Sequence, residues 1–168
     1  GARVIGVGRS PVRCEEARQT ILARTPGARI EFAVADLSSQ QAVRSLGAEL
    51  LERLGGAPLD VLVNNAGAVA SWFTPTVDGY ELQFAVNHLA PFLLTYRLLP
   101  LLKAAEMGRV VTVSSYSHNL ARFLCSQTKM ILMSLGSGRG CDTQFLFSDD
   151  ILGDYEERLP RHAAHVER

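Results

Sequence analysis

The sequence predicts an α/β fold built on a doubly wound parallel sheet, and three observations carry this prediction. Short, mainly apolar runs, such as residues 61–63 and 110–113, alternate with longer segments whose apolar residues recur every three or four positions. Uninterrupted apolar runs are typical of strands that a parallel sheet buries on both faces. Both runs end on polar side chains, Asn64 and Ser114, as strands do at the edge where open α/β sheets bind ligands.

The first part of the chain predicts a strand, a helix and a second strand. Residues 3–9 form the first strand, and Pro11 suits the first turn of the helix that follows. This helix ends where Pro26 and Gly27 interrupt it. Residues 28–35 form the second strand.

A second helix and a third strand come next. Ser38 and Ser39 are candidate N-caps, because a serine hydroxyl can accept a backbone N–H of the first turn. Gly55 and Gly56 end this helix, and residues 59–67 contain a strand predicted to be buried on both faces. The apolar residues of the helix recur at helical spacing: Val43, Leu46, Leu50, Leu51 and Leu54.

The second half of the chain opens with a long apolar segment. Residues 79–103 predict one helix with a kink at Pro91. Residues 109–113 predict a further strand, which ends on Ser114 and Ser115. Strands and helices that alternate in this way favour right-handed βαβ units.

The pattern weakens toward the carboxyl terminus. Residues 144–147 are a candidate last strand and residues 154–167 a candidate exposed helix, joined loosely by several glycines. We therefore expect one α/β core over residues 1–135 and a divergent tail over residues 136–168.

Composition narrows the class of partner. The chain has 168 residues, of which 47% are apolar, and its 17 basic and 17 acidic residues cancel. This balance predicts no nucleic-acid surface, and a small molecule is the expected partner. Charged residues and prolines break every apolar stretch before it could span a bilayer, and no secretory leader is visible. Whether the chain forms a homo-oligomer is left open.

Cysteine and histidine spacing bears on redox setting and metal binding. Cys14, Cys125 and Cys141 are odd in number and far apart, which disfavours a disulfide framework and favours a cytoplasmic location. The histidines do not cluster with cysteines or carboxylates, so we expect no metal site.

Four motifs follow one another along the chain: Asp36-Leu37, the Asn-Asn-Ala-Gly box at 64–67, Val86-Asn87-His88-Leu89 and Val113-Ser114-Ser115. In this order they resemble the short-chain dehydrogenase/reductase family. The resemblance covers about residues 1–129, and residues 84–95 are especially similar to the retinol-dehydrogenase-like branch. The resemblance implies a Rossmann-like fold and hydride transfer between a nicotinamide cofactor and a ketone, aldehyde or alcohol.

The same resemblance implies roles for individual residues. Asp36 and Leu37 would border the adenine ring, and the cofactor cleft would be lined by Asn64, Ala66 and Gly67.

The catalytic roles are carried over in the same way. Asn87 would hold a water of a proton relay, Ser115 would bind the substrate oxygen, and Lys129 would hold the nicotinamide ribose. Arg9 lies where the family places a basic residue that pairs with a 2′-phosphate. A guanidinium can grip phosphate with two hydrogen bonds, so NADP is favoured and NAD stays the alternative.

The sequence departs from the family pattern at two places. The chain begins at what matches the second strand of the family, so the glycine-rich phosphate turn and the strand before it are not seen. That strand would lie between the strand at residue 3 and the strand at residue 61, which would leave these two without a common neighbour.

The second departure is at the catalytic tyrosine. Cys125 stands four residues before Lys129, where the family has Tyr-x-x-x-Lys. A cysteine thiol is more acidic than a tyrosine phenol, so Cys125 could supply a proton. Its side chain is several bonds shorter, however, and would not reach the substrate carbonyl that a tyrosine reaches. Cys125 could equally be a small buried residue on a helix.

Three interpretations follow. The first is an oxidoreductase of the short-chain type, and the second is a catalytically inactive, truncated derivative that acts as a nucleotide-binding or interaction module. In the third, Gly6-Val7-Gly8 begins an ordinary dinucleotide fingerprint and Asp36 takes the ribose hydroxyls of NAD.

Overall fold

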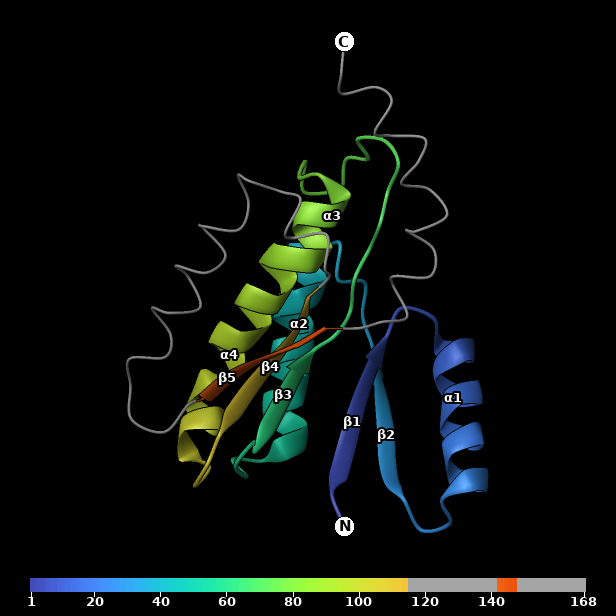
Figure 1. The fold of residues 1–168 in the computed structure, drawn as a ribbon, viewed down its shortest axis with the longest axis vertical. Helices are drawn as coiled ribbons and strands as arrows, with labels where there is room; N and C mark the ends of the chain where they lie inside the picture. The colour runs from blue at the N-terminus through green and yellow to red at the C-terminus, as the bar shows by residue number, and fades with distance from the viewer. Residues whose placement is uncertain (115–141, 148–168) are drawn as a thin grey trace. The chain divides into compact units, whose positions relative to one another are not determined.

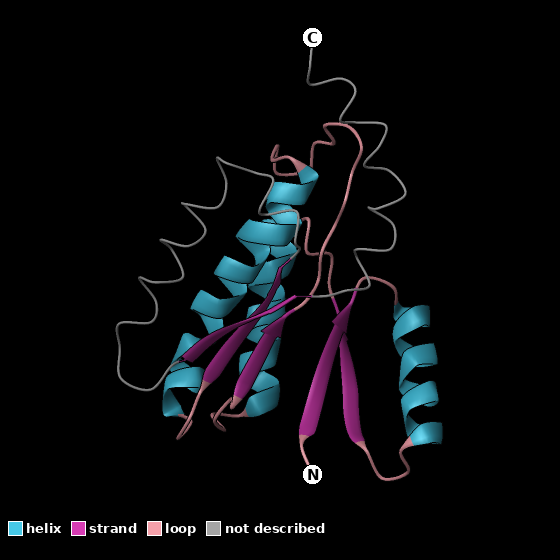
Figure 2. Cartoon of the chain, viewed as in Figure 1, coloured by secondary structure: helices cyan, strands magenta, loops and turns pink. Residues whose placement is uncertain are grey.

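The computed structural model describes residues 1–114 and 142–147 (Figure 1). The chain divides into two compact units, one made of residues 1–57 and 67–101 and the other of residues 58–66 and 102–168. Helices and strands alternate along the chain as the sequence predicts (Figure 2).

The first unit begins with a βαβ motif. Strand β1 (Arg3–Gly8) pairs in parallel with β2 (Arg29–Val34) over six residue pairs. Helix α1 (Pro11–Arg24) connects them, and the Ser10 hydroxyl at its N-cap accepts the backbone N–H of Arg13 at 3.4 Å. The predicted helix start at Pro11 is confirmed.

Two glycines of β1 make room for side chains that pack on the strand. A Cβ atom added to Gly6 would lie 2.5 Å from the Phe32 ring, and one added to Gly8 would lie 2.5 Å from Cys14 Sγ. Neither glycine has a positive φ angle. Both lie within β1, where their small size makes room for Phe32 and Cys14. The interpretation of Gly6-Val7-Gly8 as the start of a dinucleotide fingerprint stays a prediction.

Helix α2 (Gln40–Leu54) shows the predicted caps. The Ser39 hydroxyl accepts the Ala42 N–H at 3.3 Å, and Gly55 ends the helix in the left-handed region at φ 56°. In α2 the buried face consists of Val43, Leu46, Gly47 and Leu50.

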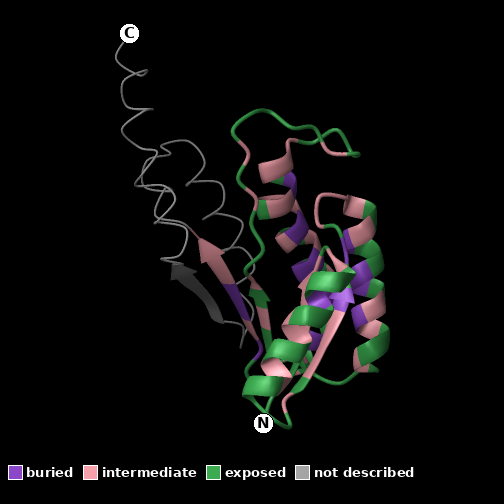
Figure 3. Ribbon diagram, turned by 90° about the vertical axis from the view of Figure 1, so that its right-hand side faces the viewer, coloured by how far each residue is buried: buried purple, intermediate pink, exposed green. Residues whose placement is uncertain are grey.

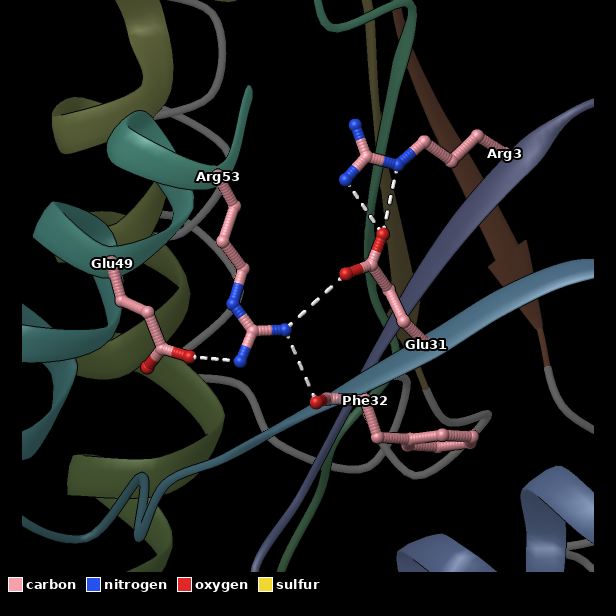
Figure 4. A network of polar contacts seen from close by, with 5 residues as sticks. All are labelled: Arg3, Glu31, Phe32, Glu49 and Arg53. Atoms are coloured by element: carbon pink, nitrogen blue, oxygen red, sulfur yellow. Dashed lines mark hydrogen bonds and ion pairs between the residues drawn. The ribbon is translucent and has the colours of Figure 1, made fainter. Parts of the chain in front are cut away.

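Polar contacts tie α2 to β2 at the end of the sheet where β1 begins (Figure 4). Glu31 accepts from Arg3 at 2.7 Å and lies 3.5 Å from Arg53, which also donates to the Phe32 carbonyl at 3.2 Å and pairs with Glu49. These groups are partly exposed, so each pair contributes at most about 1 kcal/mol. The network fixes geometry more than it adds stability.

The long apolar segment is helical without a break from Leu82 to Ala104, in three consecutive pieces. These are α3 (Leu82–Phe84), the π-helix η1 (Ala85–Leu89) and α4 (Ala90–Ala104). The departure from α-helical hydrogen bonding lies at η1, directly before Pro91, and the kink predicted at Pro91 stays a prediction. Helices α2 and α4 approach closely at Gly47, where an added Cβ would lie 3.0 Å from Arg97 Cβ.

The core of the first unit lies along these helices (Figure 3). Leu46 and Leu98 are each 1% exposed and Ala85 is fully buried. Apolar burial along α2, η1 and α4 therefore stabilises the position of the residues that η1 carries.

The second unit contains a three-stranded parallel sheet in the order β3-β4-β5. The strands are β3 (Val61–Asn64), β4 (Arg109–Ser114) and β5 (Asp142–Phe147). The last of these confirms the strand predicted at 144–147, with a start two residues earlier.

Burial in this sheet differs from the prediction. Val110 and Val111 of β4 are 5% and 7% exposed, but Val61 and Val63 of β3 are 47% and 52% exposed. The prediction that β3 is buried on both faces is wrong, because Val61 and Val63 lie on the same face of the strand and that face is about half exposed. Among the described strands, β3 has a neighbour on one side only, whereas β4 lies between two strands.

The described strands fall into two separate sheets. Strands β1 and β2 form one, strands β3, β4 and β5 the other, and no described strand joins β1 to β3. This is the division expected of a Rossmann-like parallel sheet without the strand that would pair with both. The predicted fold class, incomplete at this strand, is confirmed.

Candidate functional site

A hollow lies where β1 ends and α1 begins, within the first unit. Its volume is about 380 Å³, and its six lining residues are Gly8, Arg9, Ser10, Arg13, Cys14 and Phe32. Two of these residues are arginines and none is acidic. Backbone N–H groups and the positive end of the helix dipole at the start of α1 add to the positive charge. The hollow therefore suits an anion such as a phosphate.

The local sequence explains why both arginines line this hollow. Arg9 directly follows β1, and the Ser10-Pro11 pair starts the helix at once. Arg13 consequently falls in the first turn of α1, which contains no acidic residue. The sequence prediction named Arg9 and missed Arg13. Arg13 lies four residues after Arg9, across a Ser-Pro pair that is typical of a helix start, and this spacing was a usable signal.

Asp36 lies two residues beyond β2, beside Arg9. Its Oδ1 accepts the backbone N–H of Ser38 at 2.9 Å. Hydrogen bonds from the Ser38 backbone, then from its side chain, and the nearby charge of Arg9 hold the pKa of Asp36 below its ordinary value. Leu37, the residue between Asp36 and Ser38, is half-buried. The structure thus brings together Arg9 and Asp36, two of the residues predicted to contact the cofactor.

Asn87 lies in the π-helix η1 and uses its side chain to hold the loop after residue 67. Its Oδ1 accepts the Ala68 N–H at 2.7 Å, and its Nδ2 donates to the Ala68 carbonyl at 2.9 Å. The nearest atom to a Cβ added at Gly67 is this Oδ1, at 3.8 Å. The carboxamide therefore fixes the backbone just after the Asn-Asn-Ala-Gly box.

Other contacts order the same loop. Gln83 Nε2 donates to the Ala70 carbonyl at 3.1 Å, and Asp78 Oδ2 accepts the Gln40 N–H at 2.7 Å. Asp78 thereby places a carboxylate at the start of α2, a role that the sequence analysis missed. No local motif marks it, because the two residues are 38 positions apart.

The remaining predicted site residues are distributed as follows. Asn64 ends β3 and pairs in register with Thr112, and Ala66 follows in the same unit. Ser115, Cys125 and Lys129 lie outside the described residues, so their predicted roles stay predictions. Within residues 1–114 and 142–147, no cluster of three or more histidine, cysteine or acidic side chains could hold a metal ion.

The parallel strands and the helices that connect them define an α/β protein of the Rossmann-like type, with a hollow at the end of β1 that suits an anion. The short chain dehydrogenase family model matches residues 1–126. The chain belongs to this family, as its motifs predict.

Curated relatives share the matched region. Retinol dehydrogenase 14 from Mus musculus is 43% identical over 125 residues, covering 68% of this chain and 37% of its own length. Retinol dehydrogenase 13 from Homo sapiens is 36% identical over 118 residues, with 70% and 35% covered. The chloroplastic short-chain dehydrogenase TIC 32 A from Brassica napus is 39% identical over 123 residues, with 70% and 38% covered. This chain thus spans little more than a third of these relatives.

Solved structures confirm the fold. A metagenomic short-chain oxidoreductase in complex with NADP superposes with a TM-score of 0.67 at 23% identity, covering 88% of this chain and 71% of that one. An uncharacterised protein from Mycobacterium paratuberculosis is 40% identical, with a TM-score of 0.56 and coverage of 70% and 38%.

Among the described helices, none has the length and apolar character needed to cross a membrane.

Proposed function

We propose that this chain binds a nicotinamide dinucleotide, NADP in preference to NAD, and transfers hydride between it and a ketone, an aldehyde or an alcohol. The observation that supports this most is the hollow at the end of β1, where Arg9 follows the strand and no acidic side chain lines the wall. Family membership supplies the reaction class, and the names of the relatives suggest an apolar substrate such as a retinoid.

The described residues fit the adenosine end of such a cofactor. Arg9 would grip the 2′-phosphate with two hydrogen bonds. Asp36 and Leu37 would border the adenine, since Asp36 is already oriented by Ser38. The cofactor contacts predicted for Asn64, Ala66 and Gly67 stay predictions. The cofactor supplies the hydride, and the protein supplies binding, orientation and a path for one proton.

Asn87 would serve the proton path through its backbone. The oxygen and the nitrogen of its side chain are both hydrogen-bonded to the Ala68 backbone. The residue four positions on is Pro91, which has no N–H to donate to the Asn87 carbonyl as a residue in an α-helix would. We propose this carbonyl as the group of Asn87 that accepts a hydrogen bond from the water. Ser115 would bind the substrate oxygen, and Lys129 the ribose.

Cys125 at the tyrosine position favours a second candidate function. A cysteine side chain is too short to reach the substrate oxygen from the position of a tyrosine, so proton transfer there would need a water in between. The second candidate is accordingly a catalytically inactive protein that binds the nucleotide as a binding or interaction module.

Deuteride transfer separates the two candidates. The full chain would be incubated with NADPH deuterated at C4 and either all-trans-retinal or benzaldehyde, and the alcohol analysed by mass spectrometry. Deuterium in the alcohol, above a control without protein, supports the oxidoreductase. Saturable NADPH binding without transfer supports the inactive nucleotide-binding protein, and absence of both contradicts the two proposals together. The cytoplasmic location and the oligomeric state stay predictions.

A further inference from the structure

We propose that Arg13 is a second phosphate-binding residue and that, together with Arg9, it sets the preference for a nucleotide carrying a 2′-phosphate. This inference rests on the proposed function and adds to it a specificity-determining residue. Arg13 lines the same hollow as Arg9, from the first turn of α1 rather than from the end of β1. Two guanidinium groups on different elements would thus face one phosphate.

The charges around the hollow explain why one arginine is insufficient. A phosphate monoester carries about −1.5 to −2 charges at neutral pH. Arg9 is close enough to Asp36 to lower the pKa of that carboxyl, so part of its charge is compensated by the protein itself. With Arg13 included, the three side chains have a net charge of +1, whereas Arg9 and Asp36 alone would cancel. Arg13 supplies the excess positive charge that a 2′-phosphate needs.

Arg13 is available for this role. Arg3, Arg18 and Arg53 each form an ion pair with a glutamate. In the part of the chain that the structure describes, Arg13 has no such carboxylate partner, and its side chain is exposed.

Ser10 adds a neutral donor. Its oxygen accepts the Arg13 backbone N–H, and the hydroxyl proton remains free to point into the hollow. The backbone that carries Arg13 is therefore held by the same residue that would contact the phosphate.

Cys14 provides a local reporter of occupancy. Its thiol lines the hollow and is 7% exposed. A phosphate held by Arg9 and Arg13 would cover it further and slow its alkylation by iodoacetamide. Peptide mass spectrometry distinguishes Cys14 from the other two cysteines, so this readout does not depend on catalysis.

The experiment compares the full chain with three variants that each remove one positive charge. Arg13→Gln and Arg9→Gln alter the hollow. Arg24→Gln is the matched control, because Arg24 is an exposed arginine in the last turn of the same helix. Calorimetry would give the affinities of 2′,5′-ADP (adenosine 2′,5′-bisphosphate) and 5′-AMP, which differ only in the 2′-phosphate, so that their ratio isolates this group. The probe for protection of Cys14 would be 2′-AMP.

The proposal expects four results. The unsubstituted chain prefers 2′,5′-ADP, Arg13→Gln reduces the affinity ratio by about tenfold or more, and Arg24→Gln leaves it unchanged, since a hydrogen bond to a charged group is worth about that factor. Protection of Cys14 by 2′-AMP should likewise be lost in Arg13→Gln.

Other results overturn the inference and separate it from the proposed function. If the preference for the 2′-phosphate is lost in Arg9→Gln but kept in Arg13→Gln, Arg13 plays no part in it, while the proposal of NADP binding stands. Protection of Cys14 that depends on Arg13, without any binding of NADPH, supports the phosphate site and contradicts the proposed function. No binding and no protection contradict both.

Discussion

Replacing Asn87 with alanine should release the loop that follows the Asn-Asn-Ala-Gly box. The substitution removes two hydrogen bonds to Ala68, one of 2.7 Å to its N–H and one of 2.9 Å to its carbonyl. Each contributes about 0.5–1.5 kcal/mol net. Because Asn87 is exposed, water replaces part of these two hydrogen bonds. We therefore expect the free energy that holds the loop in place to fall by about 1 kcal/mol, at the low end of the sum.

Hydrogen exchange at the Ala68 amide measures this loss directly. A change of about 1 kcal/mol corresponds to roughly fivefold faster exchange. Trp72, the single tryptophan, lies in the same loop and is 86% exposed, so its fluorescence anisotropy reports the release independently. Asn87→Asp keeps the acceptor and loses only the donor, so it should retain most of the Ala68 protection.

Gln83→Ala is the control for general loosening. It removes a bond to Ala70 but leaves the Asn87 pair intact, so Ala68 should exchange as in the unsubstituted chain. Unchanged Ala68 exchange in Asn87→Ala would refute the anchoring role and, with it, the assignment of the proton path to the Asn87 backbone.

Three further substitutions test other contacts. Gly8→Ala should lower the free energy of unfolding by about 1–3 kcal/mol through overpacking against Cys14, and adding Cys14→Ala should restore part of it in urea denaturation; no recovery would show that the strain lies elsewhere. Asp78→Asn should speed exchange of the Gln40 amide about fivefold, because a charged acceptor at a helix start is worth about 1 kcal/mol more than a neutral one, and equal rates would contradict this. The lowered pKa of Asp36 means that its contribution to stability is present above the ordinary pKa of an aspartate and is lost as the pH falls through the lowered value. Arg9→Gln should raise that pKa in an NMR titration, and a value that does not move would remove Arg9 from the vicinity of Asp36.

Local signals in the sequence predicted most of the first unit. Ser39 and Gly55 bound α2 as expected, because capping depends on residues a few positions apart. The exposure of Val61 and Val63 was not predictable from their apolar run, since the burial of a sheet face depends on what packs against it.

The site was predictable only in part for the same reason. Motifs marked Arg9, Asp36 and Asn87, but the bonds that Asn87 makes to Ala68 link positions 19 residues apart. The π-helix at Ala85–Leu89 was also unforeseen, because a single wide turn leaves the apolar periodicity of a helix almost unchanged.

The most direct test of the account is the affinity of the full chain for NADPH and NADH, measured by the fluorescence of the reduced nicotinamide. The account predicts saturable binding, at least about tenfold tighter for NADPH, and loss of that preference in Arg9→Gln. Equal affinities for the two nucleotides, or no saturable binding of either, would contradict the claim that the hollow at the end of β1 is a phosphate-binding site for NADP.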